Sequence, residues 1–291
     1  MIPRFSLARP RTLAEAFEAF AAAEGEGAYI AGGTELLQVM KMGFAQFETL
    51  VDIKAIPELH GIELSDDGAL RIGAATTHRS IERSADVMSA FPGLVGLERQ
   101  VANVRVRSTG TLGGNLAFAE PHSDPATLLL ASDARVELSG PGGDRALSLS
   151  EFILGPLSTA REPEEIVTGI RIPAARDGEG RAYGKFAFFE RPAASVAVRV
   201  SVRGGAIEAA TVAVGSLTEV PTIVDGAGAA LIRTTTDPAA LERGIAAATE
   251  AFGDLDAVED LNGSADYKRH LAAVLLATTT RAAVQEAIDH A

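Results

Sequence analysis

Two glycine clusters constrain this chain more than any other feature. The first lies at residues 31–36 (AGGTEL), directly after a short apolar run, and the second at residues 109–116 (TGTLGGNL). Adjacent glycines allow positive φ and carry no side chains, so successive backbone N–H groups can converge on an anion. Thr34 and Thr111 add hydroxyl donors, and the Asn115 amide both donates and accepts. Two such clusters suit a pyrophosphate with polar arms, and a pair of ordinary tight turns is the alternative.

The sequence lacks the common nucleotide-binding motifs. Neither cluster contains G-x-G-x-x-G, so Asp52, which lies at about the ~20-residue spacing of a Rossmann acidic residue, gives only weak support for that fold. No Gly-Lys-Ser/Thr occurs, which excludes a P-loop. The adjacent residues His122, Ser123 and Asp124 do not form a hydrolase triad, because neighbouring side chains point apart, and we predict a loop there.

Composition excludes several classes of function. Acidic residues outnumber basic ones by 39 to 26 and the net charge is −13, which argues against binding of nucleic acid. There is no cysteine, so the chain has no disulfide, thiolate nucleophile or Cys-ligated iron–sulfur cluster. The histidines show no metal-ligand spacing, so we expect no metal site. No apolar run approaches the ~20 residues of a membrane span, and the N-terminus lacks a secretory signal, so we expect a cytoplasmic protein.

The length of 291 residues and the hydrophobic pattern indicate two domains. We predict a first domain at residues 1–175, with parts at about 1–56 and 57–175, in which short strands alternate with helices. The charged, glycine-bearing segment 174–181 is the predicted linker. The second domain, residues 178–291, begins with strand patterns and ends with helical ones, which indicates an α+β fold.

Local signals place several elements within these domains. Thr12 is the predicted N-cap of the first helix, with Glu15 three residues further on. A helix predicted at about residues 92–101 precedes the polar, glycine-rich run 105–115. In the second domain, two strand patterns meet at Gly204-Gly205, which is a hairpin signal. A long alanine-rich helix is predicted over residues 265–290.

Taken together, these residues resemble the FAD-binding subunit or domain of the molybdenum hydroxylases, the family of carbon monoxide dehydrogenase and xanthine dehydrogenase. The resemblance runs along nearly the whole chain. Its most specific part is T-x-G-G-N at residues 111–115, followed nine residues after the Asn by Asp124; AGGTEL, residues 183–186 (YGKF) and Arg191-Pro192 agree with it. The resemblance implies an N-terminal α/β FAD-binding domain related to vanillyl-alcohol oxidase rather than to Rossmann proteins, followed by an α+β domain with an antiparallel sheet and helices.

The resemblance also implies a site for non-covalent FAD. Both clusters would bind the pyrophosphate, and Asp124 would accept hydrogen bonds from ribose hydroxyls. Val167 and Lys185 would lie near the isoalloxazine, where a cation would favour the anionic reduced flavin. No catalytic residue and no metal ligand is implied. The implied cofactor-binding residues are Ile30, Ala31, Gly32, Gly33, Thr34, Glu35, Leu36, Thr111, Gly113, Gly114, Asn115, Asp124, Val167 and Lys185.

The chain departs from the family pattern in three places. Glu35 stands where relatives often have Asp, and Arg107-Ser108 stands where many have an Arg-Asn pair. Near Val101 there is no aromatic residue, although xanthine dehydrogenase relatives cover the flavin from that segment. We therefore expect an acceptor site that differs from one that stacks nicotinamide.

In this family, electrons pass from a molybdenum–pterin centre on a large subunit through [2Fe–2S] clusters on a small subunit to FAD, and then to NAD+, oxygen, a quinone or another carrier. The resemblance implies that this chain is the FAD-carrying electron-transfer subunit of such an oxidoreductase, in a dimer of heterotrimers, and that the substrate is chosen on another chain. One alternative is a self-sufficient FAD oxidase of the vanillyl-alcohol oxidase class, for which the C-terminal part is short. The other is a scaffold that has lost flavin, against which the intact polar residues of both clusters argue.

Overall fold

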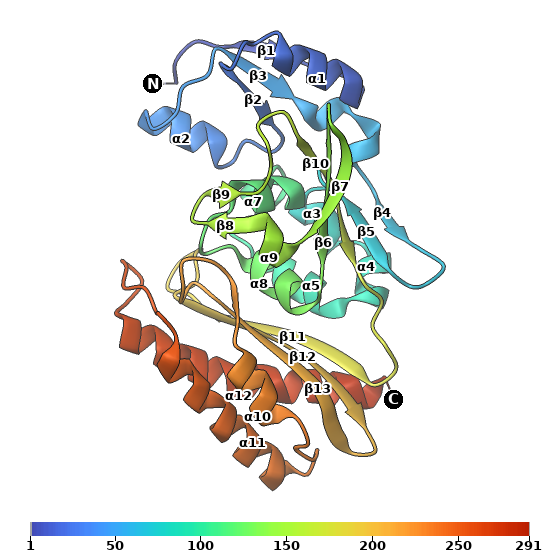
Figure 1. The fold of residues 1–291 in the computed structure, drawn as a ribbon, viewed down its shortest axis with the longest axis vertical. Coiled ribbons are helices and arrows are strands. Elements are labelled where there is room, and N and C mark those ends of the chain that lie inside the picture. The colour runs from blue at the N-terminus through green and yellow to red at the C-terminus, as the bar shows by residue number, and fades with distance from the viewer. Residues whose placement is uncertain (1, 291) are drawn as a thin grey trace.

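A computed structural model describes residues 2–290, so Met1 and Ala291, the end residues of the predicted domain ranges, lie outside the described residues. Figure 1 shows three parts stacked along the long axis: an N-terminal part in blue, a middle part in cyan and green, and a C-terminal part in yellow to red. Each part has its own buried apolar cluster. None of the helices within residues 2–290 is long and apolar enough to cross a membrane.

The N-terminal part is a small parallel sheet with two helices. Thr12 caps α1 as predicted, since its hydroxyl accepts from the Glu15 backbone N–H at 3.2 Å. Gly43 ends α2 with a φ of +82°, a conformation that glycine adopts without strain. The strand order is β1-β3-β2. The elements are β1 (Ser6–Ala8), α1 (Leu13–Ala21), β2 (Gly27–Ile30), α2 (Leu36–Met42), β3 (Thr49–Asp52), η1 (Ile53–Ala55) and η2 (Pro57–Leu59).

The middle part is a five-stranded antiparallel sheet in the order β4-β5-β10-β6-β7, covered by short helices. Its strands are β4 (Ile62–Leu64), β5 (Leu70–Gly73), β6 (Arg135–Gly140), β7 (Gly143–Ser148) and β10 (Ile166–Ile172), with a separate pair β8 (Ile153–Gly155) and β9 (Ser158–Thr159). The helices are α3 (His78–Glu82), α4 (Ala85–Ala90), α5 (Pro92–Glu98), α6 (Val104–Arg107), α7 (Leu112–Phe118), α8 (Asp124–Ala131) and α9 (Leu149–Phe152).

Two polar segments of this part begin helices, and the second of them corrects the loop predicted at residues 122–124. The run 105–115 is largely helical, because Asn103 caps α6 by accepting from the Arg105 and Val106 N–H groups, and Thr111 caps α7. Asp124 does not lie in a loop but is the first residue of α8, whose N-cap is Ser123. Capping side chains at short spacing start a helix even where the sequence is polar and glycine-rich.

The C-terminal part is an antiparallel sheet in the order β11-β12-β13-β14, with helix α12 against one face and α8 of the middle part against β12 and β13. Gly204 and Gly205 both have positive φ and form the predicted hairpin between β12 and β13. The elements are β11 (Glu179–Phe186), β12 (Ala194–Arg203), β13 (Ala206–Gly215), β14 (Thr222–Ile223), α10 (Asp225–Leu231), α11 (Pro238–Glu250), η3 (Ala251–Asp254) and α12 (Ala265–Asp289). The α+β class predicted for this part is confirmed.

The predicted linker 174–181 is too long at its C-terminal end. Residues 179–181 belong to β11 and are buried. Gly180 packs so closely against α12 that a Cβ there would lie 2.0 Å from the Ala283 carbonyl oxygen. Charged residues are tolerated in this buried strand because Arg181 Nε donates to Glu179 Oε1 at 2.6 Å. The charged residues and the glycine at 179–181 therefore belong to a closely packed strand and not to the linker.

Candidate functional site

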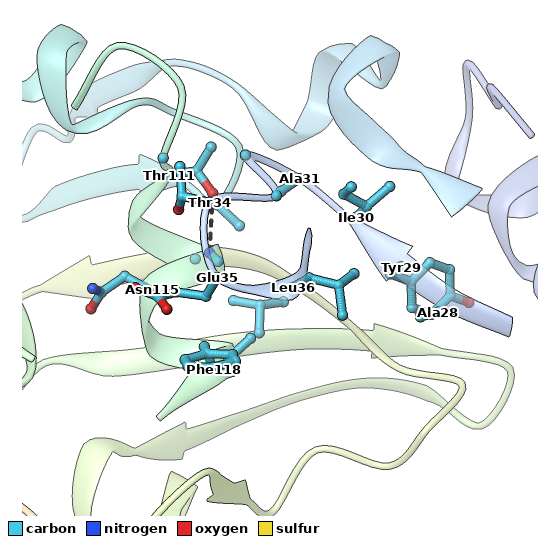
Figure 2. Close-up of a pocket in the computed structure, with 18 of the residues that line it drawn as sticks. Ala28, Tyr29, Ile30, Ala31, Thr34, Glu35, Leu36, Thr111, Asn115 and Phe118 are labelled. Carbon is cyan, nitrogen blue, oxygen red and sulfur yellow. Dashed lines mark hydrogen bonds between the residues drawn. The ribbon is translucent and has the colours of Figure 1, made fainter. Parts of the chain in front are cut away.

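A cavity of about 1170 Å³ lies between the N-terminal and middle parts. Typical sites for drug-sized ligands enclose about 300–1,000 Å³, so this one accommodates a larger molecule, such as a dinucleotide. Figure 2 shows residues that line it: Tyr29 and Ile30 from β2, Thr34 and Glu35 from the turn that follows, and Thr111, Asn115 and Phe118 at helix α7. All the predicted cofactor-binding residues except Lys185 line this one cavity.

The first glycine cluster is an open turn between β2 and α2. Gly33 has a φ of +68°, in the left-handed region that favours glycine. The backbone N–H groups of residues 31–35 find no acceptor among residues 2–290. The Thr34 hydroxyl likewise makes no hydrogen bond there. Adjacent unpaired donors in a cavity wall form an anion-binding surface, so this cluster has the predicted nest character.

The second cluster works differently from the prediction. Gly113 and Gly114 have no positive φ, and they lie in the first turn of α7. Their N–H groups are used within the protein: Gly113 donates to the Ala74 carbonyl at 2.9 Å and Gly114 to Thr111 Oγ1 at 3.1 Å. A Cβ on Gly113 would lie 2.4 Å from the Cβ of Ala74. Gly113 allows α7 to pack against Ala74, just after β5, and the two glycines do not form a second nest.

Side chains are what the second cluster offers to a ligand. Thr111 accepts from Gly114, which leaves its O–H free to donate. Asn115 Oδ1 accepts from Ser123 Oγ at 2.6 Å, and its Nδ2 has no acceptor within residues 2–290. The oxygen of Asn115 is therefore held and its amide donor remains available at the cavity wall.

The two clusters touch each other. A Cβ on Gly32 would lie 2.4 Å from the Thr109 carbonyl oxygen, and a Cβ on Gly110 would lie 3.4 Å from Thr34 Oγ1. A side chain at position 32 would clash with the backbone of the second cluster, so this close approach requires glycine there. As a result, the unpaired N–H groups of the first cluster and the side-chain donors of the second converge on one space.

At the cavity wall, Asp124 forms a buried ion pair with Lys185. Its Oδ2 accepts from Lys185 Nζ at 2.7 Å and its Oδ1 from the Tyr183 hydroxyl at 2.5 Å. Burial raises the pKa of Asp124, although the charge and hydrogen bond of Lys185 oppose that shift. Lys185 itself does not line the cavity, and its ammonium is hydrogen-bonded to Asp124, which does.

Comparison with known proteins places the chain in a family. Residues 3–175 match the family described as "FAD binding domain in molybdopterin dehydrogenase". The chain belongs to this family. Residues 190–283 match "CO dehydrogenase flavoprotein C-terminal domain".

Medium chains and subunits of known proteins match this chain along nearly their whole length. The carbon monoxide dehydrogenase medium chain of Hydrogenophaga pseudoflava is 32% identical over 283 residues, 97% of each chain. The nicotine 6-hydroxylase medium subunit of Paenarthrobacter nicotinovorans is 31% identical over 280 residues, 96% of each chain. Among solved structures, carbon monoxide dehydrogenase from H. pseudoflava, lacking the Mo-pyranopterin moiety, aligns with a TM-score of 0.92 at 31% identity, covering 98% of this chain and 99% of that one.

The family departures have local explanations in the structure. Arg107 donates to the carbonyls of Val101 and Ala102 at 2.9 and 3.1 Å, and to Glu82, so the segment ahead of α7 is held although Ser108 replaces an Asn. Val101 and Ala102 line the cavity without an aromatic ring. The substitution at Glu35 leaves a carboxylate near the surface, 3.6 Å from Arg191.

Two polar groups of this medium-subunit cavity were missed by the sequence reasoning. His122 joins the parts, since Nδ1 lies 2.9 Å from Glu120 Oε1 and Nε2 lies 2.8 Å from Asp260 Oδ2 in the C-terminal part. The hydrogen bond to Glu120 is the main factor that raises the pKa of His122, against a lowering by burial. His78 also lines the cavity and pairs with Glu98. Asp260 and Glu98 are distant in the sequence from His122 and His78, so no local signal marks these two contacts, although Glu120 lies only two residues before His122.

The donors of the cavity fit FAD. A flavin dinucleotide needs an anion site for its pyrophosphate and hydrogen-bonding groups for its ribose and ring, and the cavity provides unpaired N–H groups at residues 31–35 beside the Asn115 and Thr111 donors. Within residues 2–290 there is no group of three or more His, Asp or Glu side chains that could hold a metal ion.

Proposed function

We propose that this chain binds FAD non-covalently and carries electrons through it as the medium subunit of a molybdenum hydroxylase complex. The observation that carries the proposal is the convergence of the two clusters: unpaired N–H groups at residues 31–35 face the free donors of Thr111 and Asn115 across one large cavity. The self-sufficient oxidase is not favoured, because similar medium chains match this one over nearly all of their length.

In this proposal each part of the cavity holds one part of the cofactor. The turn from Ala31 to Leu36, with Ile30 leading into it, binds the pyrophosphate together with Thr111 and Asn115. Gly113 and Gly114 let α7 come close enough to do so. Asp124 accepts from ribose hydroxyls with the lone pairs that Tyr183 and Lys185 leave free.

Val167 on β10 completes the proposed site as an apolar contact near the isoalloxazine. Lys185, which forms an ion pair with Asp124, contributes its positive charge to the electrostatics of the bound flavin in this proposal. Bound FAD supplies the electron-carrying chemistry, and the protein supplies binding, orientation and electrostatics. No acid–base residue of this chain is required, so we assign it no catalytic side chain.

The proposed partners come from the family. The sequence has no cysteine and so cannot supply Cys ligands to an iron–sulfur cluster, and we propose that [2Fe–2S] clusters lie on a small subunit and the molybdenum–pterin centre on a large one. We propose a dimer of heterotrimers that passes electrons to an external acceptor. The cytoplasmic location and the domain ranges 1–175 and 178–291 remain parts of this proposal.

Co-expression of the three chains tests the function. We expect one stable assembly on size-exclusion chromatography, from which acid precipitation releases all flavin as free FAD. Anaerobic addition of the substrate of the complex should bleach the flavin absorbance. The isolated 291-residue chain should bind FAD but show no bleaching with that substrate.

Two results would contradict the proposal. Absence of flavin from the purified assembly would support the scaffold alternative. Substrate-driven bleaching by the isolated chain would revive the self-sufficient oxidase.

A further inference from the structure

A buried charged pair beneath the second glycine cluster has no role in the function proposed so far. His78, the first residue of α3, places Nδ1 2.8 Å from Oε2 of Glu98, the last residue of α5. The two side chains are 3% and 0% exposed. A buried ion pair is costly, and apolar residues of similar size usually stabilise a fold as well or better. The pair therefore calls for an explanation other than stability.

The pair is mounted against the cavity. The His78 backbone N–H donates to the Gly110 carbonyl at 3.1 Å, and a Cβ on Gly110 would lie 3.3 Å from the imidazole Cδ2. His78 lines the cavity, whereas Glu98 does not. The ring is thus packed against the backbone of the second cluster, between the cavity and the buried carboxylate.

One ring nitrogen of His78, Nε2, is available for a hydrogen bond to a ligand. Nδ1 is used by Glu98, and Nε2 makes no hydrogen bond within residues 2–290. Glu98 Oε1 is completely enclosed and has no hydrogen-bond partner among residues 2–290, whereas Nε2 of His78 is not completely enclosed. The polar atom that this pair can offer to a ligand in the cavity is therefore Nε2.

The charges around the ring favour the imidazolium. Burial lowers the pKa of His78, but the charge and hydrogen bond of Glu98, with the charge of Asp124, outweigh it, and the pKa is raised. Arg107 on α6 opposes them weakly, since it is paired with Glu82 on α3.

The state of the ring decides what Nε2 can do. In the imidazolium, both ring nitrogens donate. When the proton leaves, Nδ1–H stays with Glu98, and Nε2 becomes an acceptor. Phosphate, carbonyl and ring-nitrogen atoms of a flavin dinucleotide are acceptors, so only the protonated ring can hydrogen-bond to them.

We propose that His78 donates a hydrogen bond from Nε2 to an acceptor atom of the bound FAD, and that Glu98 is the positioning residue that orients and charges the imidazole. The inference rests on the proposed FAD site. It adds a pH dependence to cofactor affinity: FAD binds tightly while His78 is protonated and more weakly once the proton is lost.

Titration of FAD into the flavin-free full chain, followed by quenching of flavin fluorescence from pH 5.5 to 9, tests this proposal. The wild-type affinity should fall by about ten- to a hundredfold as the pH rises, which is the size expected for loss of a hydrogen bond to a charged group. His78→Gln keeps an amide in place of the ring, and its affinity should not change with pH. Glu98→Gln keeps an acceptor for Nδ1 but removes the charge, so the midpoint of the pH dependence should move to lower pH.

His122 also lines the cavity and titrates, so His122→Gln is the matched control. It should keep the wild-type midpoint. Circular dichroism and melting temperature at pH 7 establish that each variant is folded. An unchanged pH dependence in folded His78→Gln, or an unchanged midpoint in Glu98→Gln, would overturn the proposal. If the wild-type chain binds no FAD at any pH, the proposed function fails, whereas pH-independent tight binding removes only the role of His78.

Discussion

Lys185 Nζ lies 2.7 Å from Asp124 Oδ2, and this pair joins β11 of the C-terminal part to α8 of the middle part. Both side chains are almost fully buried, at 8% and 6% exposed. The same ammonium donates to the Gln100 carbonyl at 2.8 Å. Asp124 lines the cavity, so the negative charge that faces the proposed cofactor is balanced by the positive charge of Lys185.

Removing one member of this pair should destabilise the fold. Lys185→Met leaves a buried carboxylate without its cation, and breaking a buried pair in this way costs about 3–5 kcal/mol. The double variant Asp124→Asn with Lys185→Met should lose less than Lys185→Met alone, because no uncompensated charge remains. Urea unfolding measures both. Arg281→Met, in the exposed pair with Glu242, is the control and should change stability far less, because solvent screens an exposed pair.

The same variants test the electrostatics of the flavin. Lys185→Met leaves the Asp124 charge uncompensated beside the cavity, which disfavours an anionic reduced flavin, so the midpoint potential should fall. Adding Asp124→Asn should bring it back toward wild type. Spectroelectrochemistry of the flavin-loaded chain checks this, and a wild-type potential in Lys185→Met would show that the pair does not act on the ring.

Gly33 and Gly43 separate backbone strain from cofactor contact. Both have positive φ, at +68° and +82°, but only Gly33 lines the cavity. Gly33→Ala and Gly43→Ala should each lower stability by about 1 kcal/mol or more, because alanine is strained at positive φ. Only Gly33→Ala should also weaken FAD binding, by about tenfold, since the displaced turn misaligns its N–H groups. Equal FAD affinity in the two variants would remove the first cluster from the site.

Asn115→Asp removes the amide donor and adds a negative charge beside the proposed pyrophosphate, and both changes oppose binding. The new carboxylate still accepts from Ser123 Oγ, so the melting temperature should remain close to wild type. The Nδ2 donor is lost, which should weaken FAD binding by about ten- to a hundredfold for a bond to a charged group. Flavin titration of the folded variant decides the matter, and wild-type affinity would place Asn115 outside the cofactor contacts.

His122 should make the stability of the chain depend on pH. Its pKa is raised in the folded protein, so its contribution is complete below the unfolded value of about 6.5 and is lost as the pH rises through the folded value. His122→Asn should therefore cost more at pH 6, by about 1–2 kcal/mol, than at pH 9. Urea unfolding at both pH values measures this. His270→Asn, at an exposed position, serves as control, and an equal cost of His122→Asn at both pH values would contradict the argument.

The sequence by itself determined the local features of this protein. Thr12 and Glu15 predicted the start of α1, and Gly204-Gly205 predicted the hairpin of β12 and β13. The two glycine clusters predicted the cavity wall, and the resemblance that they carried predicted the family. These features depend on hydrogen bonds and φ values within a few residues, which the local sequence specifies.

Only the tertiary structure decided what each cluster does. Gly113 and Gly114 share their residue type with Gly32 and Gly33, yet the N–H groups of the second cluster are consumed by Ala74 and Thr111 while those of the first stay unpaired. The bond from Gly114 to Thr111 is a local helix cap, but the bond from Gly113 depends on which strand end packs against α7, and no pattern within the cluster encodes that contact.

The buried pairs were decided in the same way. Asp124 with Lys185, His78 with Glu98, and His122 with Asp260 each join residues from separate elements. Their energies depend on burial and on the distance between charged atoms, and both arise only when the separate elements pack together, within the middle part for His78 and Glu98 and between the middle and C-terminal parts for the other two pairs. The sequence determined which groups could ionise, and the packing of the chain decided which of them meet.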